Sequence, residues 1–428
     1  MGWFMANGYG AQSWNRTWDG TIARDWMKPD FFVEMARALE RACFDFMMFE
    51  DSLIIPDTYG GSTEFNLRNG HRAPKNDPAT LIPVLGYTTS KIGLVSTLST
   101  TFYHPFHLAR LAASLDHLTD GRFGWNIVTT SNPAAAANYG TELPAHDDRY
   151  DIADEFVELA ERLWDSWEPG SVVMDEEAGV FIDHTKVKPV NFEGQYYKSA
   201  GPLNTQPPFQ GYPVYVQAGG SERGRQFAAT HAEVIVCMAK GVDAMKAFRD
   251  DIHNRMEKMG RDPRCCKVLY LFDPVVGENE TDVRAKLEIR DAKRLSVDGE
   301  LTLSGYSDTS GIDLSTIDLD EPLENYRRED GHLAVLEQLM QVGPTMRDVL
   351  PTLDMTTMDV AGTPDQVAGQ MEEIMQEVGG DGYLISGWEI TRRRVAEIAD
   401  GLAPALKRRG LIRDGYTKDT FREHLLEY

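Results

Sequence analysis

Short apolar runs alternate with longer amphipathic stretches along most of this chain. Runs rich in Val, Ile, Leu, Phe and Met are typical of strands that are buried on both faces, whereas apolar residues at helical spacing indicate helices. The segment 30–41 is of the second kind, because Phe32, Met35 and Leu39 recur on one helical face. The alternation predicts a parallel sheet built from strand–helix units.

The apolar runs predict eight strands, which span residues 2–6, 44–49, 92–98, 123–128, 214–217, 234–237, 268–272 and 382–386. Helices are expected between them at 30–41, 78–89, 105–118, 149–167, 221–231 and 363–377. Eight strands with intervening helices fit an α/β fold of the (β/α)₈ or TIM-barrel type. In this interpretation residues 1–428 form a single barrel domain.

Two regions interrupt the alternation. Residues 168–212 are rich in Pro, Gly and aromatic residues, and they predict an insertion after the fourth strand with short strands at 187–192 and 195–198. Residues 277–360 predict a second insertion after the seventh strand, helical near 281–295 and 332–341 and irregular between them. We expect this second insertion to lie over the barrel mouth as a lid, with a solvated surface or an oligomer contact as the alternative. Helices close the chain as a C-terminal extension.

Charge and composition narrow the possible partners. The 428 residues carry a formal net charge of −24, which repels nucleic acid and anionic membranes, so neither is expected to bind. No window approaches the ~20 apolar residues of a membrane span, and the N-terminus shows no secretion signal. The four scattered cysteines lack zinc-like spacing, so we expect no metal and a cytoplasmic protein with reduced thiols.

Polar side chains follow several of the predicted strands. Thr130 and Ser131 come after the fourth strand, Ser99 and Thr100 after the core of the third, and Asp51 after the second. Because the carboxyl ends of barrel strands meet at one face, these groups are expected at the mouth of a site. For Asp51 the alternative is a helix cap.

The segment 213–224 is a candidate phosphate cradle. A strand ends at Gln217, Gly219 and Gly220 follow, and Ser221 opens a helix. Glycines permit close backbone approach, and a helix N-terminus favours an anion. An ordinary turn with Ser221 as the N-cap is the alternative.

The start of the helix after the fourth strand offers further phosphate ligands. It carries Arg149 and Tyr150, whose guanidinium and hydroxyl groups are natural partners of a phosphate, with His146 nearby. Alternatively, Arg149 forms an ion pair with Asp147 or Asp148. The alternative for Tyr150 is that its ring only packs against neighbouring residues.

Several motifs occur in a defined order along the chain. They are Thr-Leu-Ser-Thr-Thr-Phe at 97–102, Leu-Asp-His-Leu-Thr-Asp-Gly-Arg at 115–122, Trp-Asn-Ile-Val-Thr at 125–129, Asn-Tyr-Gly at 138–140, His-Asp-Asp-Arg-Tyr at 146–150 and Gln-Ala-Gly-Gly-Ser at 217–221. This ordered set resembles the large subunit of two-component flavin-dependent monooxygenases in the bacterial luciferase-like superfamily. Within it, the chain looks like the group of nitrilotriacetate, dibenzothiophene-sulfone and long-chain alkane monooxygenases.

The resemblance implies a cofactor, a co-substrate and a partner. The cofactor is FMN, used as FMNH₂ that a separate NAD(P)H:flavin reductase supplies, and O₂ is the co-substrate. One oxygen atom enters a small organic substrate through a flavin peroxide. The sequence agrees, because it lacks the strand–GxGxxG–helix signature of a resident nicotinamide site. A homodimer or homotetramer is expected.

The motifs and the resemblance together nominate site residues. Cofactor contacts are expected from Asp51, Ser99, Thr100, Asn126, Thr130, His146, Tyr150, Gln217, Gly219, Gly220 and Ser221. His104 and Asn126 are the catalytic candidates, since an imidazole can transfer a proton near neutral pH and an Asn amide can bond the isoalloxazine edge. A buried Asn that serves the barrel backbone is the alternative for Asn126.

Some interpretations stay open at this point. Four aromatic residues either line an apolar substrate pocket or belong to the core, namely Phe4, Trp14, Trp18 and Phe49. Two other functions compete with the monooxygenase: a deazaflavin (F420)-dependent reductase of the same superfamily, and a non-catalytic flavin-binding protein.

Overall fold

The computed structural model describes residues 1–12, 25–294, 296–326, 333–353, 356–387 and 390–427. Eight parallel strands close into a barrel in the order β1-β16-β13-β12-β11-β6-β5-β3. They are β1 (Gly2–Met5), β3 (Phe46–Phe49), β5 (Gly93–Ser99), β6 (Phe123–Val128), β11 (Val214–Gln217), β12 (Val234–Cys237), β13 (Lys267–Phe272) and β16 (Gly382–Ile385). All eight predicted strands are present, and the TIM-barrel prediction is confirmed.

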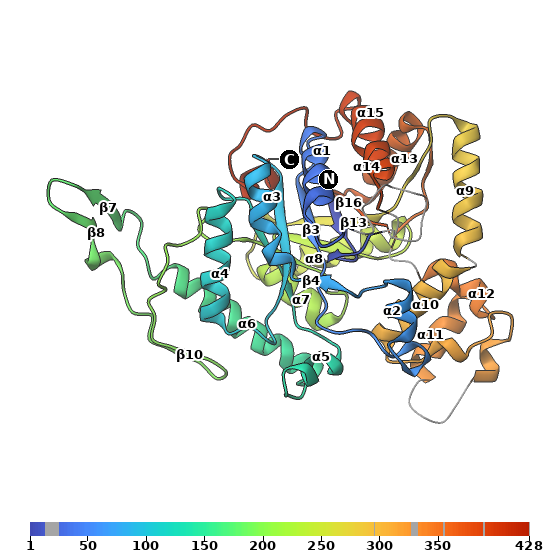
Figure 1. Ribbon diagram of the computed structural model, residues 1–428, viewed down its shortest axis with the longest axis horizontal. Coiled ribbons are helices and arrows are strands. Elements are labelled where there is room, and N and C mark those ends of the chain that lie inside the picture. The colour runs from blue at the N-terminus through green and yellow to red at the C-terminus, as the bar shows by residue number, and fades with distance from the viewer. Residues whose placement is uncertain (13–24, 295, 327–332, 354–355, 388–389, 428) are drawn as a thin grey trace.

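Helices pack around the outside of the barrel (Figure 1). They are α1 (Asp30–Arg41), α3 (Ile82–Thr88), α4 (Pro105–Leu118), α6 (His146–Trp164), α7 (Glu222–His231), α8 (Val242–Lys258), α13 (Pro364–Val378), α14 (Arg392–Ala396) and α15 (Ala403–Arg408). Helix α6 begins at His146 instead of 149, because Asp147 and Asp148 in its first turn favour the positive end of the helix dipole. Helix α8 was not predicted, although Met245, Ile252 and Met256 recur on one helical face and are buried.

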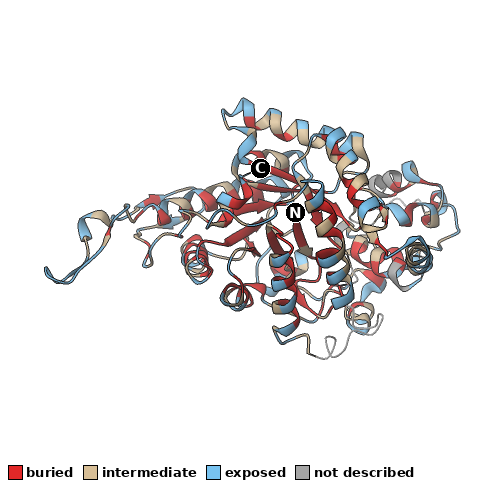
Figure 2. Cartoon of the chain, turned by 90° about the horizontal axis from the view of Figure 1, so that it is seen from above, coloured by how far each residue is buried: buried red, intermediate tan, exposed pale blue. Residues whose placement is uncertain are grey.

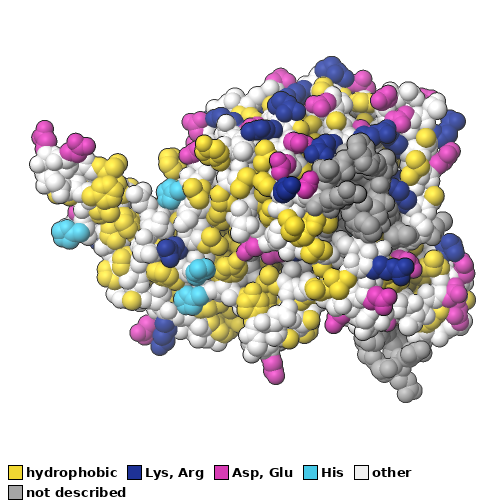
Figure 3. Space-filling view, viewed as in Figure 1, with side chains coloured by type: hydrophobic (Ala, Val, Ile, Leu, Met, Phe, Trp, Pro, Cys, Tyr) yellow, Lys and Arg dark blue, Asp and Glu magenta, His cyan; other side chains and the backbone are white. Residues whose placement is uncertain are grey.

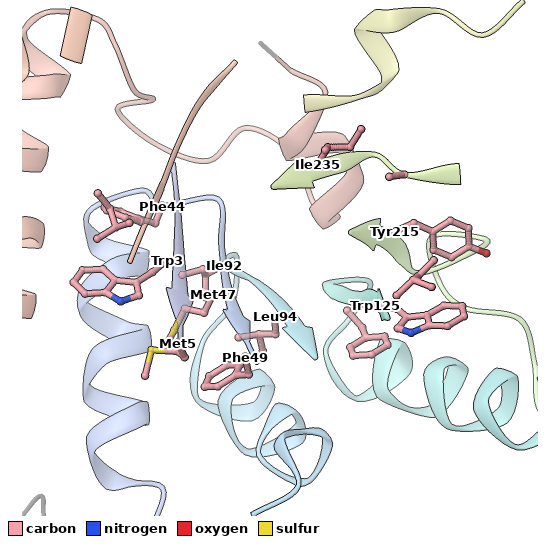
Figure 4. Close-up of a cluster of buried hydrophobic side chains, with 14 of the residues drawn as sticks. Trp3, Met5, Phe44, Met47, Phe49, Ile92, Leu94, Trp125, Tyr215 and Ile235 are labelled. Atoms are coloured by element: carbon pink, nitrogen blue, oxygen red, sulfur yellow. The ribbon is translucent and has the colours of Figure 1, made fainter. Parts of the chain in front are cut away.

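The strands separate two apolar layers, as their alternating side chains require. Phe46 and Met48 point into the barrel with Val95, Val216 and Leu271. Met47 and Phe49 point the other way, into the layer between the strands and the helices, which Figure 4 shows with Trp3, Met5, Trp125 and Tyr215. Phe49 is fully buried there, so it belongs to the core and not to a substrate pocket. Trp14 and Trp18 lie outside the described residues.

The C-terminal extension ends in a short helix, α16 (Phe421–Leu425), which closes the amino end of the barrel. Phe421 is completely buried and packs with the residues inside the barrel. A Cβ added to Gly93 or Gly124, at the start of β5 and β6, would lie 2.6 or 3.1 Å from its ring. The site at the opposite, carboxyl end is therefore built on a barrel whose other end is sealed.

The first insertion forms two antiparallel hairpins. The outer hairpin pairs β7 (Val172–Asp175) with β8 (Val180–Ile182) and projects from the barrel as an arm (Figures 1 and 3). Its side chains Met174 and Phe181 are exposed. The inner hairpin pairs β9 (Phe192–Glu193) with β10 (Lys198–Ser199). The strands predicted at 187–192 and 195–198 are therefore mostly wrong, because Pro189 cannot donate to a ladder and the turn starts at 194.

The second insertion is more helical than predicted. It contains α9 (Glu280–Arg294), α10 (Val297–Ser310), α11 (Leu333–Val342) and α12 (Met346–Val349), between the short strands β14 (Val275–Val276) and β15 (Ala361–Gly362). The irregular stretch expected between the two predicted helices is wrong, because α10 occupies its first half. Helix α10 buries Ser304 and Ser307 together with leucines, so its sequence lacks a clear apolar face.

Helices α10–α12 form a separate apolar cluster beside the loop that follows β3. That loop contains α2 (Glu64–Asn69), and its strand β4 (Lys75–Asn76) pairs with β2 (Tyr9–Gly10). The Gly60 amide donates to Asp313 Oδ1 at 2.9 Å, and Ser304 donates to Asn66 Oδ1 at 3.1 Å. Because both segments follow carboxyl ends of barrel strands, this lobe lies on the mouth side. Figure 2 shows buried residues lining the barrel and exposed ones on the projecting segments.

Candidate functional site at the carboxyl end of the barrel

Three separate hydrogen bonds join β5 to β6 and to the residues that follow them. The Ser99 and Thr130 hydroxyls lie 2.7 Å apart, and the Thr100 hydroxyl donates to the Val128 carbonyl at 3.2 Å. Deeper in the barrel, Asn126 Nδ2 donates to Thr97 Oγ1 at 2.8 Å. Ser99, Thr100 and Thr130 thus lie at the carboxyl ends of two adjacent strands, as predicted, and Ser131 beside them is exposed.

Two buried amide oxygens at this end have no hydrogen-bond partner among the described residues. They are Asn126 Oδ1 and Gln217 Oε1. A buried acceptor without a partner costs about 1–3 kcal/mol, so a ligand with N–H or O–H groups would be stabilised here. Asn126 does not serve the barrel backbone through its amide nitrogen, which bonds the Thr97 side chain instead.

Asp51 lies just past β3 and is half-buried. Burial raises the pKa of its carboxyl to about 7, with Lys75 opposing the shift and Glu50 and Asp77 adding to it. Lys75 Nζ is itself held by Glu50 at 2.5 Å and by the Ser52 hydroxyl at 3.0 Å. This side of the mouth therefore carries a carboxyl group that can change its protonation state near neutral pH.

The starts of α6 and α7 meet around Gly224. Ser221 is the N-cap of α7 and its hydroxyl accepts from the Gly224 amide at 3.0 Å, which is the alternative role that the sequence left open for it. A Cβ added to Gly224 would lie 2.7 Å from the Tyr150 hydroxyl and 2.9 Å from Ser221 Oγ. The two hydroxyls predicted to bind one phosphate are thus brought to the same point, and only a glycine leaves them room.

The preceding turn is shaped by its glycines. A Cβ on Gly219 would lie 2.6 Å from the Gln217 amide nitrogen and 3.0 Å from the Gly224 carbonyl carbon, whereas one on Gly220 would meet nothing within 4 Å. Gly219 is therefore required for packing, and Gly220 faces open space. This open turn before a ten-residue helix suits close approach of an anion to backbone amides.

Two further residues at the start of α6 differ in burial, since His146 is exposed and Arg149 is buried. His146 is exposed, its Nδ1 lies 2.7 Å from Asp147 Oδ1, and its ring contacts the Tyr150 ring at 5.3 Å. Arg149 is buried and donates to the Thr130 carbonyl at 2.9 Å, so the expected alternative of a pair with Asp147 or Asp148 is not formed. Arg149 also lines a pocket of about 270 Å³ with Thr100, Thr101 and Tyr197.

His104 has a structural role in this fold. It is the N-cap of α4, its Nδ1 accepts from the Phe106 amide at 3.2 Å, and its ring meets Tyr197 edge-on at 5.9 Å. It is exposed and shares no contact with Asn126 or Asp51 in the described structure. The catalytic role of His104 stays a prediction, and neither its capping bond nor its exposure supports that role.

Sequence reasoning missed Arg223, which lies in the first turn of α7. Its guanidinium lies 5.5 Å from the centre of the Tyr150 ring and bonds Asp151 and Asp154 of α6. The motif Ser-Glu-Arg-Gly contained the signal, because it places an Arg in the first turn of a helix that starts next to the phosphate cradle. Among the described residues, no group of three His, Cys, Asp or Glu side chains could hold a metal ion.

Comparison with known proteins places this geometry in a family. The family model of luciferase-like monooxygenases matches residues 2–382. The chain belongs to this family. It is 34% identical over 96% of its length to dibenzothiophene-sulfone monooxygenase of Rhodococcus erythropolis, covering 92% of that protein. It is 36% identical over 92% of its length to nitrilotriacetate monooxygenase component A of Aminobacter aminovorans, covering 89% of that protein.

Solved structures agree with this assignment. The crystal structure of DmoA from Hyphomicrobium sulfonivorans superposes with a TM-score of 0.88 at 33% identity, over 100% of this chain and 92% of that one. A riboflavin lyase crystallised with modified FMN and riboflavin superposes at 0.86 and 31% identity, over 100% and 95%. An F420-dependent secondary alcohol dehydrogenase reaches only 0.60 at 16% identity, over 95% and 98%, so it shares the fold alone. The sequence relatives are monooxygenases. This confirms the predicted enzyme class over the two alternatives, a deazaflavin-dependent reductase and a non-catalytic flavin-binding protein.

Proposed function

We propose that this protein is the oxygenase component of a two-component monooxygenase, which binds FMNH₂ from a separate NAD(P)H:flavin reductase. The observation that carries the proposal is the cradle at Gly224, where Tyr150 and Ser221 converge. It supports a phosphate ligand in a chain whose near full-length relatives are monooxygenases. One of those relatives is named as a component A, which supports a second, separate component.

The residues of the site fit reduced FMN. The Tyr150 and Ser221 hydroxyls and the amides of the 219–221 turn would hold the phosphate. The free oxygens of Asn126 and Gln217 would accept from N–H groups of the flavin or its ribityl hydroxyls. Ser99, Thr100 and Thr130 would line the ring's edge, with Asp51 across the mouth and His146 beside Tyr150.

Bound FMNH₂ supplies the electrons with which O₂ is activated, and the chain's own contribution is to bind, orient and exclude water. Asp51 can hold or release a proton near pH 7, because burial raises the pKa of its carboxyl into that range. The lobe of α10–α12 on the mouth side is suited to shield the site as a lid, which stays a proposal. The substrate is proposed to be a small organic molecule.

A pair of glycine variants tests the cofactor site. In Gly224→Ala the new methyl group would occupy the space between the two hydroxyls, so we expect anaerobic FMNH₂ binding to fall at least roughly 100-fold. In Gly415→Ala, in the C-terminal extension and away from the mouth, the methyl group meets nothing within 4 Å, and affinity should stay within a factor of about two. Equal affinities of the two variants would refute the proposed phosphate site.

The reaction is tested with the whole system. The protein, a flavin reductase, NADH, FMN and ¹⁸O₂ are incubated with dibenzothiophene sulfone, dimethyl sulfide, a long-chain alkane or nitrilotriacetate, and products are analysed by mass spectrometry. One labelled oxygen atom per product molecule is expected for an accepted substrate. If FMNH₂ is oxidised but no product of any of the four substrates contains the label, the protein does not oxygenate these substrate classes.

We also propose a homodimer or homotetramer. The arm of β7 and β8 exposes Val173, Met174, Val180 and Phe181, which a second copy could cover. Light scattering measures the oligomeric state of the wild type and of Phe181→Asp, and the variant should dissociate. A monomeric wild type would refute it.

A cytoplasmic location stays a prediction; the four cysteines are free, and no described helix is long and apolar enough to cross a membrane.

A further inference from the structure

Arg223 lies where it can act on the phosphate of the cofactor, and this inference rests on the proposed function. We propose that Arg223 is a positioning residue that also supplies the positive charge of the phosphate site, acting through Tyr150 and the start of α7. The sequence suggested Arg149 as the cation at this place, but its guanidinium donates to the Thr130 carbonyl.

The contacts place Arg223 directly against a proposed phosphate ligand. Its guanidinium lies over the Tyr150 ring at 5.5 Å, and the hydroxyl of that ring reaches Gly224, the next residue of α7. A cation over an aromatic face is attracted to it, and its field makes the phenol a better hydrogen-bond donor to an anion. The residue is therefore adjacent to the phosphate site without filling it.

The surrounding charges make such a cation necessary. Four exposed carboxylates lie near the two helix starts: Asp147 and Asp148 in the first turn of α6, Asp151 in its second turn, and Glu222 in the first turn of α7. A phosphate that binds here meets these carboxylates in a protein whose net charge is −24. The partial charge of a helix N-terminus offsets only about half an elementary charge.

The other cations nearby are used elsewhere. Arg149 turns toward the Thr130 carbonyl on the barrel side. Arg225 contacts Glu222 and Asp251, and so faces α8. His146 lies against Asp147. Arg223 also has carboxylate partners, Asp151 and Asp154, but among these guanidinium groups it is the one that lies against the Tyr150 ring from the first turn of α7.

One carboxylate of α6 fastens α7 at both ends. Asp154 binds Arg223 near the start of α7 through one oxygen and lies 2.7 Å from His231 Nε2, at the end of α7, through the other. Asp151 adds a second contact to Arg223 at 2.9 Å. Since Tyr150 is on α6 and Ser221 caps α7, this clamp sets how far apart the two phosphate-binding hydroxyls lie.

The test separates charge at the phosphate from general stability, because riboflavin lacks the phosphate. Wild type, Arg223→Gln, Arg223→Lys and the control Arg225→Gln are titrated anaerobically with dithionite-reduced FMN and with reduced riboflavin, and tryptophan fluorescence is followed. Arg223→Gln should weaken FMN binding roughly ten-fold and leave riboflavin binding within a factor of about two. Arg223→Lys should recover most of the loss, and Arg225→Gln should match the wild type.

Two further measurements sharpen the result. The ten-fold difference should shrink as NaCl rises from about 0.05 to 0.5 M, because salt screens a charge effect. Asp151→Asn removes a negative charge near the phosphate, so its FMN affinity should equal or exceed that of the wild type. If Arg223→Gln does not fold, Asp151→Asn still tests whether charge near the phosphate controls FMN affinity.

Other outcomes overturn the inference. Equal losses for FMN and riboflavin in Arg223→Gln would make Arg223 merely structural, and no loss for either would remove it from the site. Weaker FMN binding in Asp151→Asn would contradict a role through charge. A wild type that binds FMN no more tightly than riboflavin would instead refute the phosphate site of the proposed function, and with it this inference.

Discussion

Removing the Phe421 ring tests how the C-terminal extension supports the barrel. Phe421 is fully buried at the amino end, its ring centre lies 5.5 Å from that of Phe46, and it fills the space left by Gly93 and Gly124. Replacing a buried Phe with Ala costs about 3–5 kcal/mol when the surroundings cannot collapse, and less when they can. The size of the loss therefore depends on whether α16 stays in place.

Polar contacts next to Phe421 hold α16 in place. Arg422 forms an ion pair with Glu233 at 2.5 Å and donates to the carbonyls of Gln210, Tyr212 and Pro213. With the helix anchored, Phe421→Ala should leave a cavity instead of letting the helix collapse inward. We therefore expect a loss of unfolding free energy near the upper end, about 4 kcal/mol.

Urea denaturation followed by circular dichroism measures this loss, with Phe209→Ala as the matched control because Phe209 is 69% exposed. The control should change stability by less than about 0.5 kcal/mol. FMNH₂ affinity of folded Phe421→Ala should stay unchanged, because the mouth lies at the other end of the barrel. A loss below about 1 kcal/mol would refute the reasoning, since it would mean that the ring fills no essential space.

Three further predictions concern the site and its supports. Tyr150→Phe should weaken FMNH₂ binding by about 1.5–3 kcal/mol while leaving binding of reduced riboflavin unchanged, because only the phosphate contact is lost; equal losses for both flavins would contradict it. Asp51→Asn should raise the melting temperature more at pH 8 than at pH 5. Burial raises the pKa of Asp51 to about 7, above the ~3.9 of an unfolded Asp, so the wild type loses stability as the pH rises through that interval; a constant difference across thermal scans at several pH values would argue against this. Glu155→Ala should speed hydrogen exchange at the amides of Gln195, Tyr196 and Tyr197 by roughly ten-fold or more, because one carboxylate accepts from all three, and unchanged exchange by mass spectrometry would show that the turn holds without it.

Local sequence patterns were sufficient to predict the barrel. Each buried strand is a run of apolar residues, and the helices between them show their period and their caps, such as His104-Pro105 and Thr363-Pro364. These are local signals that neighbouring residues carry. The polar residues at strand ends could be assigned to one mouth for the same reason, because parallel strands bring their carboxyl ends together.

Tertiary structure alone decided where side chains meet. Nothing in the sequence places Tyr150 against Gly224, or Phe421 under β5 and β6, because these contacts join segments that are far apart along the chain. The roles of Arg149 and His104 were decided in the same way, by the Thr130 carbonyl and by the amide of Phe106. Helix α10 was missed because burial on several sides replaces the one-sided apolar pattern by which a surface helix is found. Local pattern thus determines elements, whereas the packing of distant elements determines which groups form a site.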